Sequence, residues 1–246
     1  MNNYLPTDYQ SFIHTSRYAR WLEEEGRRET WGETVGRYMD SIVEPIIDSG
    51  ENENSFNVAN EIEQAILGLE VMPSMRSMMT AGVAAARDNT CMYNCSYLVI
   101  DDPKAFDEAM FILLCGTGVG FSCERQYIKN LPEVPETLYD SETTIVVKDS
   151  KEGWAKAYRL LISMLFAGEI PTWDVSKVRP AGARLKTFGG RASGPAPLVD
   201  LFNFTIDTFK KAAGGKLSSY ECHSIMCKIG EVVVVGGVRR SAMISL

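Results

Sequence analysis

The sequence predicts an α/β fold in residues 86–246, preceded by a helical region in residues 1–85. The α/β prediction rests on a strand–helix–strand pattern between residues 95 and 123, because a crossover helix joins strands that run parallel. It also rests on later segments in which apolar residues recur at helical spacing, namely 154–166, 197–212 and 218–229. The helical region is predicted because residues 17–38 and 58–69 show the same spacing.

In the helical region, we expect residues 17–38 to form two helical pieces separated at Gly26. Glu33 and Arg37 lie four residues apart, which predicts an ion pair on a solvent-exposed helix face. Residues 72–79 contain four methionines, whose flexible side chains fill irregular gaps. We therefore expect a packed linker there.

The strand–helix–strand pattern begins with residues 95–100, for which we expect a buried strand. Asp102 is the expected N-cap of the helix, with Pro103 at its first position. Residues 116–120 read G-x-G-x-G, but they follow a helix and precede a strand, the reverse of a dinucleotide-binding turn. They are either a tight turn or a place where the backbone closely approaches a ligand.

Four later segments complete the pattern. Residues 129–150 are polar and contain prolines, which predicts a loop or an edge hairpin. Residues 189–195 form a second glycine-rich loop, and residues 218–221 read as a capping box. Residues 232–235 are four valines that favour a strand by propensity but continue a helix without a turn, so both alternatives stay open.

Composition limits the classes of function. The net charge of −7 argues against a nucleic-acid or membrane-surface binder, because such proteins are usually basic. No apolar run reaches the roughly 18 residues that span a bilayer, and the first residues lack a secretion signal. We expect a cytoplasmic protein with reduced thiols. Two histidines and six cysteines without a CxxC pair predict no metal site.

The histidines, five of the cysteines and the last eleven residues carry the other chemical groups of interest. His14 and His223 have no nucleophile or carboxylate partner in the local sequence, so neither receives a role. Small apolar fillers are expected at Cys91, Cys115, Cys123, Cys222 and Cys227. Residues 236–241 form a loop in which two glycines precede Arg239 and Arg240, whose charged forks suit phosphate or carboxylate. An apolar strand follows at 243–246 and needs a pairing partner.

Seven short motifs follow one another along the chain: Arg27-Arg28-Glu29-Thr30-Trp31 with Glu33-Thr34-Val35, Met72-Pro73-Ser74-Met75-Arg76, Asn94-Cys95, Gly118-Val119-Gly120-Phe121-Ser122, Arg179-Pro180-x-Gly182-Ala183, Phe188-Gly189-Gly190-x-Ala192-Ser193-Gly194-Pro195 and Gly236-x-Val238-Arg239-Arg240-Ser241-Ala242. In this order they resemble adenosylcobalamin-dependent (class II) ribonucleotide reductases of the monomeric kind, which reduce ribonucleoside triphosphates. The resemblance runs from about residue 15 to the last residue.

The resemblance implies that residues 86–246 are the first part of a ten-stranded α/β barrel, with an inserted effector-site segment at about 140–215. It implies that Cys95 is one of two redox-active cysteines, while a third cysteine becomes a transient thiyl radical. Substrate-binding residues are implied at Asn94, Ser74, Thr117 and Gly118.

The resemblance also implies regulation by a deoxynucleotide (dNTP) effector. Its implied contacts are Asp102 and a specificity loop made of Gly236, Gly237, Val238, Arg239, Arg240 and Ser241. The implied cofactor is adenosylcobalamin, held mainly by a C-terminal part of the reductase. The implied partners are that C-terminal fragment, the nucleotide substrate and a thioredoxin-like reductant.

The second redox cysteine, the radical cysteine and the proton-transferring asparagine and glutamate of the family lie beyond the specificity loop. We therefore expect no turnover from this chain alone. A split gene, an intein and a truncated record remain alternative explanations. A regulatory deoxynucleotide-binding protein that has lost catalysis is the alternative function, and retention of Cys95 favours the reductase. The inserted segment disfavours a third alternative, a class I-like fragment with an external radical subunit.

Overall fold

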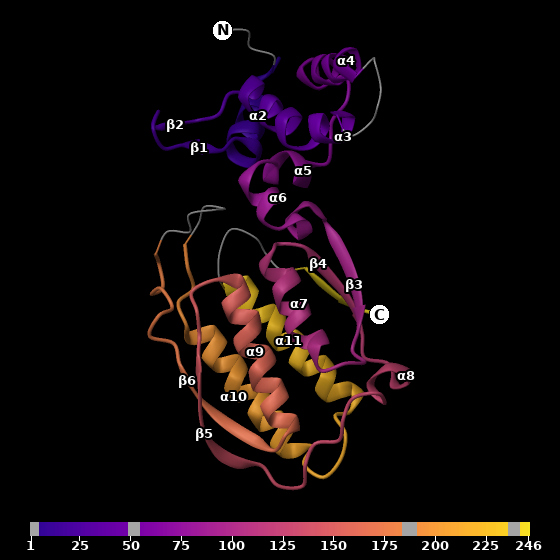
Figure 1. Ribbon diagram of the computed structural model, residues 1–246, viewed down its shortest axis with the longest axis vertical. Coiled ribbons are helices and arrows are strands. Elements are labelled where there is room, and N and C mark those ends of the chain that lie inside the picture. The colour runs from indigo at the N-terminus through magenta and orange to yellow at the C-terminus, as the bar shows by residue number, and fades with distance from the viewer. Residues whose placement is uncertain (1–4, 49–54, 184–190, 236–241) are drawn as a thin grey trace. The chain divides into compact units, whose positions relative to one another are not determined.

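The computed structural model describes residues 5–48, 55–183, 191–235 and 242–246 (Figure 1). The chain divides into two compact units, Met1–Tyr93 and Asn94–Leu246, so the division falls after Tyr93 rather than after residue 85.

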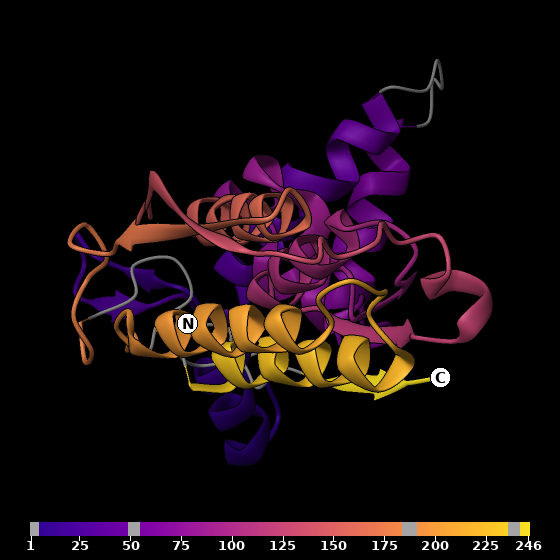
Figure 2. The same cartoon turned by 90° about the horizontal axis from the view of Figure 1, so that it is seen from below.

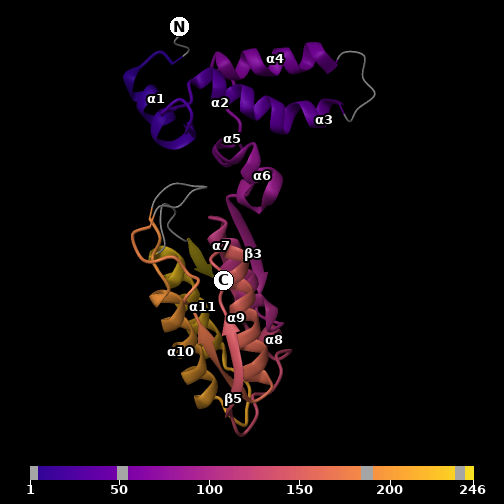
Figure 3. The same ribbon diagram turned by 60° about the vertical axis from the view of Figure 1, so that its left-hand side comes forward.

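The first unit is built mainly of short helices around one small apolar core. Its elements are α1 (Asp8–Ile13), the π-helix η1 (His14–Tyr18), β1 (Trp21–Leu22), β2 (Arg27–Arg28), α2 (Trp31–Tyr38), the π-helix η2 (Met39–Val43), α3 (Glu44–Asp48), α4 (Ser55–Leu67), α5 (Met75–Thr80), α6 (Val83–Arg87) and the 3₁₀-helix η3 (Asn89–Met92). Helix α4 packs across α2 and α3 (Figure 3). Trp31, Val35 and Ile66 are buried where they meet, and so is Met78 of the methionine-rich segment.

The prediction of two helical pieces in residues 17–38 was wrong for the first piece. A short antiparallel pair, β1 and β2, occupies that stretch and turns at Gly26, whose φ of +64° suits glycine. Helix α2 starts only after Thr30, whose side chain accepts a hydrogen bond from the backbone of Glu33 in a capping box. The apolar spacing did not reveal the hairpin, because two-residue strands carry almost no periodic signal.

The ion pair predicted between Glu33 and Arg37 was also wrong. Arg27, at the end of the hairpin, donates to both carboxylate oxygens of Glu33 at 2.8 and 2.7 Å. Arg37 instead donates to Glu29 at 2.8 and 2.9 Å, and its side chain is largely buried. The capping box turns the Glu33 carboxylate toward the helix start, where the hairpin presents Arg27.

The second unit is an α/β structure with two parallel sheets. Its elements are β3 (Cys95–Val99), α7 (Lys104–Leu114), β4 (Gly118–Ser122), α8 (Arg125–Ile128), β5 (Tyr139–Val146), α9 (Lys151–Phe166), β6 (Glu169–Asp174), α10 (Ala196–Lys211), α11 (Ser219–Val235) and β7 (Met243–Ser245). The strand order is β3-β4-β7 in one sheet and β5-β6 in the other. All three pairings are parallel, which confirms the predicted α/β class.

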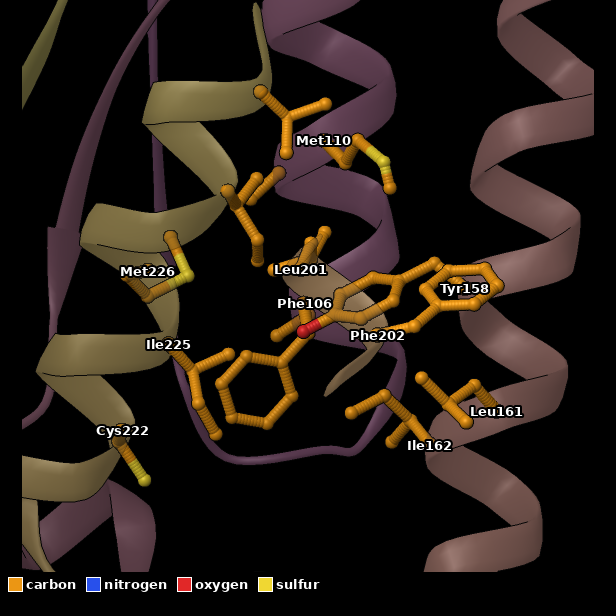
Figure 4. Packing of buried hydrophobic residues seen from close by; sticks show 14 of the residues in the cluster. Phe106, Met110, Tyr158, Leu161, Ile162, Leu201, Phe202, Cys222, Ile225 and Met226 are labelled. Atoms are coloured by element: carbon orange, nitrogen blue, oxygen red, sulfur yellow. The ribbon is translucent and has the colours of Figure 1, made fainter. Parts of the chain in front are cut away.

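Four helices form the centre of this unit. Helix α7 packs on α9 and α11, and α10 packs on the same two helices, so that the four enclose an apolar core. Figure 4 shows Phe106, Tyr158, Phe202 and Ile225, one from each helix, meeting in that core. The β3-β4-β7 sheet lies against α7 and α11, and the β5-β6 pair lies against α9 (Figures 1 and 2).

Most helical predictions in this unit are confirmed. The capping box at the start of α11 is present, because Glu221 accepts from the Ser218 backbone at 2.8 Å and Ser218 accepts in return. The four valines at 232–235 continue α11, which resolves the open alternative in favour of helix. The predicted strand at 243–246 is β7, and one of its edges pairs with β4.

Two local predictions need correction. The loop or edge hairpin expected at 129–150 contains β5, which pairs in parallel with β6 after the α9 crossover. Helix α7 begins at Lys104, so Pro103 rather than Asp102 is the N-cap residue. The Asp102 carboxylate nevertheless accepts a hydrogen bond from the Lys104 backbone at 2.8 Å, which is the expected capping chemistry displaced by one residue.

Candidate functional site

The candidate site lies at the amino ends of strands β3 and β4. Cys95 and Gly118 are register partners there. The Gly118 backbone N–H donates to the Asn94 carbonyl at 2.9 Å, and the Ser96 hydroxyl donates to the Gly118 carbonyl at 3.0 Å. The parallel ladder therefore brings three predicted site residues, Asn94, Cys95 and Gly118, to one edge of the sheet.

Strand β7 adds a third segment to this edge. The Val119 backbone N–H donates to the Ala242 carbonyl at 2.9 Å. A Cβ at Gly118 would lie 3.3 Å from the same Ala242 oxygen and 3.5 Å from the Asn94 carbonyl oxygen. Ala242 was not a predicted site residue. The sequence held one signal for it, because Ala242 stands directly before the apolar, strand-like run at 243–246.

The sheet presents Cys95 on an open face, so the prediction of a buried strand at 95–100 was wrong. Val119 and Phe121 are each only 2% exposed because they face the helices. Successive side chains alternate between faces, which places Cys95 and Tyr97 on the opposite side, where Tyr97 is 54% exposed. Their register partners there are both glycines, Gly118 and Gly120. Neither glycine carries a side chain, so the backbone of β4 is not covered by a side chain of its own beside the Cys95 thiol.

The turn before β4 is held from two sides. The Thr117 N–H donates to the Ile112 carbonyl at 3.2 Å, and the Thr117 side chain is buried. At the start of α9, the Lys151 ammonium donates to the Cys115 sulfur at 3.1 Å. The same ammonium lies 4.8 Å from the centre of the Phe111 ring. Helix α9 is thus attached to the end of α7, just before the turn that leads to Gly118.

Asp102 does not lie at this edge of the sheet. Asp102 precedes α7 while Thr117 follows it, and an 11-residue helix separates them by about 16 Å. Ser74 belongs to the first unit, where it is the N-cap residue of α5 and its side chain is exposed. The specificity-loop residues Gly236, Gly237, Val238, Arg239, Arg240 and Ser241 lie outside the described residues. Ala242, which follows that loop, is described and belongs to the site edge.

The thiols fall into two groups. Burial raises the pKa of Cys123 and of Cys222 to about 12, so both stay protonated at neutral pH. Cys91 and Cys115 are buried as well, as expected of fillers, but the Cys115 sulfur also accepts the hydrogen bond from Lys151. Only Cys95 and Cys227 are exposed among the cysteines.

Two expectations for helix α11 were wrong. Cys227 is exposed rather than a buried filler. His223 has a nucleophile partner, because the Cys227 sulfur lies 3.6 Å from its Nδ1. The signal in the sequence was the spacing of four residues, which places two side chains on the same face of a helix.

Two cavities formed by the described residues measure about 310 and 270 Å³, near the lower limit of small-molecule sites. A corrin ring fits in neither of these two. Within the described ranges, no three His, Cys, Asp or Glu side chains gather in a metal-binding arrangement. No helix in those ranges combines the length and apolar character needed to cross a membrane.

Comparison with protein families gives one match inside this unit. Residues 127–208 match the family described as B12-dependent ribonucleotide reductase, insertion domain. The match spans β5, α9 and β6 and most of α10, so it includes the two helices that pack on α7 and α11.

Curated proteins match nearly the whole chain. The adenosylcobalamin-dependent ribonucleoside-triphosphate reductase of Lactobacillus delbrueckii subsp. bulgaricus is 31% identical, over 93% of this chain and 39% of its own length. The protein of the same name from Lactobacillus leichmannii is 30% identical over the same shares. A putative one from Mycobacterium phage D29 is 29% identical, over 95% of this chain and 39% of its own. The chain spans about two fifths of the length of these relatives.

A solved structure shows the same arrangement. A crystal structure of a B12-dependent (class II) ribonucleotide reductase superposes with a TM-score of 0.81 at 25% sequence identity. The superposition covers 96% of this chain and 41% of that protein. The resemblance seen in the sequence motifs therefore extends to the fold.

Proposed function

We propose that this chain, which is related along almost all of its length to part of the B12-dependent (class II) ribonucleotide reductases, supplies the Cys95 portion of a ribonucleoside-triphosphate reductase. The observation that carries the proposal is the convergence of Asn94, Cys95 and Gly118 at one sheet edge. The thiol there is exposed, and its register partner on β4 is a glycine, which leaves the thiol accessible to a nucleotide.

The chemistry proposed for this edge is reduction of the ribose 2′ carbon by thiols. Two thiols give up two electrons and two protons, the 2′ hydroxyl leaves as water, and the carbon gains a hydrogen. The thiols become a disulfide. Cys95 is the proposed thiol on this chain, and its accessible position suits a group that must meet both substrate and a second thiol. The second thiol and the thiyl-radical cysteine are assigned to the remaining three fifths of the reductase.

Adenosylcobalamin, named for the relatives, is the proposed source of the radical. Because the described cavities do not fit a corrin, we assign its binding to the remainder of the reductase. The 246-residue chain then turns nothing over by itself. Its proposed partners are that C-terminal part, a nucleotide substrate and a thioredoxin-like reductant that reduces the disulfide again.

We propose that a dNTP effector regulates the site from the end of the helices where α7 and α11 finish and α9 begins. Residues 236–241 directly precede Ala242 in the sequence, so an effector bound by them is proposed to act on the site edge through the Ala242 carbonyl. The Lys151–Cys115 contact attaches helix α9, which belongs to the inserted segment, to the end of α7 just before the turn to Gly118. Asp102 lies a helix length away, so another element would have to join it to this effector.

The test is reconstitution. The chain is combined with a polypeptide covering the remaining part of a relative, adenosylcobalamin and a dithiol, and deoxynucleotide formation is measured. We expect product only when both polypeptides are present. Cys95→Ser abolishes it, while Cys227→Ser, which removes the other exposed thiol, does not. Deoxynucleotide binding without product from any pairing would contradict the proposal and support the alternative, a regulatory binding protein.

A further inference from the structure

The second exposed thiol has an imidazole neighbour that Cys95 lacks among its described contacts. The Cys227 sulfur lies 3.6 Å from Nδ1 and 3.9 Å from Nε2 of His223, one helical turn earlier on α11. The His223 ring is itself supported by Phe121 of β4, with ring centres 5.7 Å apart. An imidazole at this distance can accept the thiol proton and leave the thiolate, which is the nucleophilic form of cysteine.

The pair opens into a cavity between α11 and the β3-β4-β7 sheet. The cavity holds about 310 Å³ and is lined by Phe121, His223, Cys227, Gly230, Met243 and Ser245. Its walls are mainly apolar, with the thiol and imidazole as its reactive groups. This volume admits a small organic molecule but not a protein segment.

We propose that Cys227 is a site of reversible thiol modification that forms mixed disulfides with low-molecular-weight disulfides. His223 takes the thiol proton, and the Cys227 thiolate attacks one sulfur of the incoming disulfide. The S–S bond of that disulfide breaks as the new one forms. The leaving thiolate takes the proton from the imidazolium. Cys227 is thereby oxidised and half of the small disulfide is reduced, so protons and electrons balance.

An adduct in this cavity competes with strand β7 for space. Met243 of β7 packs directly on α11, since a Cβ added at Gly230 would meet its sulfur at 2.6 Å. A group attached to Cys227 occupies the cavity that Met243 lines and presses on β7 from the side of α11. The backbone bond from Val119 to Ala242 then weakens. Whether this alters reduction rests on the proposed function, but the loosening itself does not.

The thiol test compares the two exposed cysteines on this chain. Cys95→Ser leaves Cys227 as the reactive exposed thiol, and Cys227→Ser leaves Cys95. Both variants react with hydroxyethyl disulfide, and mass spectrometry locates and times the adduct. We expect Cys227 to react about tenfold faster than Cys95, because the neighbouring imidazole can take up the proton as the sulfur attacks. His223→Gln in the Cys95→Ser background brings the rate down to that of Cys95.

Equal rates for the two thiols, or an unchanged rate in His223→Gln, would overturn the proposal. Circular dichroism shows whether His223→Gln folds, and the comparison of Cys227 with Cys95 stands without that variant. Hydrogen exchange supplies the second readout: modification should speed exchange at the Val119 and Leu246 amides, which bond across the β4–β7 pair. Because the Cys95→Ser variant lacks the proposed catalytic thiol, this result is independent of the reductase assay.

Discussion

Cys95 and Gly118 are register partners, each the first residue of its strand in the parallel pair of β3 and β4. Each strand therefore forms one side of the candidate site with its first residue. Cys95 carries the side chain, and Gly118 carries none. Ala242 closes the third side through its carbonyl, which bonds to Val119.

Gly118→Val tests whether the site edge requires a residue without a side chain at position 118. Its Cβ would lie 3.3 Å from the Ala242 oxygen, which is tighter than ordinary contact, and the two methyl groups would add further overlap. We expect a loss of about 1–3 kcal/mol in the free energy of unfolding, measured by urea denaturation, and loss of product in the reconstituted enzyme. Gly215→Ala is the control, since its Cβ would meet nothing closer than 3.6 Å. Unchanged stability in Gly118→Val would contradict the tight packing.

Arg159→Met tests the link between α9 and α7. Asp107 is only 3% exposed, and the Arg159 Nε donates to both its oxygens at 3.0 and 2.9 Å. Burial raises the pKa of the Asp107 carboxyl, and Arg159 opposes this rise. Without Arg159 the buried carboxylate has lost this partner, which costs about 2 kcal/mol at neutral pH after allowance for the half-exposed arginine.

The same variant carries a pH signature. Loss of Arg159 raises the pKa of Asp107 further, so the unfolded state holds its proton less tightly than the folded state does. The deficit of the variant should therefore shrink as the pH falls toward about 4. Glu108→Gln is the control, because its 3.7 Å contact with Arg159 is solvent-exposed and worth little. A deficit in Arg159→Met that is constant between pH 7 and 4 would sink this explanation.

Acid should weaken the first unit through His14. Burial lowers the pKa of the His14 imidazole, which lies 2.9 Å from the Thr34 hydroxyl. Below the ordinary value of 6.5 the unfolded state therefore binds more protons, so stability falls as the pH falls. Hydrogen exchange of the α2 amides, corrected for intrinsic rates, should show less protection at about pH 5.5 than at 7.5.

Protonation of Glu29 should reduce the stability of the first unit further at lower pH. Burial alone would raise the pKa of its carboxyl, but hydrogen bonds from Arg37 and the Arg20 backbone hold the pKa below its usual value. Its contribution to stability is lost only as the pH falls through that lowered value, so the two groups separate by pH. His14→Gln should remove the earlier loss and leave the later one. An identical pH profile in His14→Gln would refute the assignment to His14.

The sequence predicted the helices of the second unit well, and physical reasons explain why. Helices such as α7 and α11 bury one stripe in a shared core, so the spacing of Phe106, Met110, Ile225 and Met226 reports their structure directly. The crossover rule then gave the parallel pairing of β3 with β4.

Local sequence patterns did not reveal which face of a strand is buried or which distant strands pair with each other. The apolar character of residues 95–100 did not reveal that Cys95 and Tyr97 face away from the helices, since the choice of face depends on the sheet. The pairing of β5 with β6 joins strands separated by all of α9. The carbonyl of Ala242 carries no side-chain signal at all, and only the placed strand β7 brings it to Val119.

A single turnover without added reductant tests whether Cys95 is one of the two reducing thiols. The reconstituted pair is fully reduced, freed of small thiols and given one portion of labelled ribonucleoside triphosphate with adenosylcobalamin. Product is counted, and peptide mapping locates the disulfide that forms. We expect about one deoxynucleotide per pair and Cys95 in the new disulfide, in agreement with a two-thiol reduction. Product formation with Cys95 still present as a free thiol would contradict it.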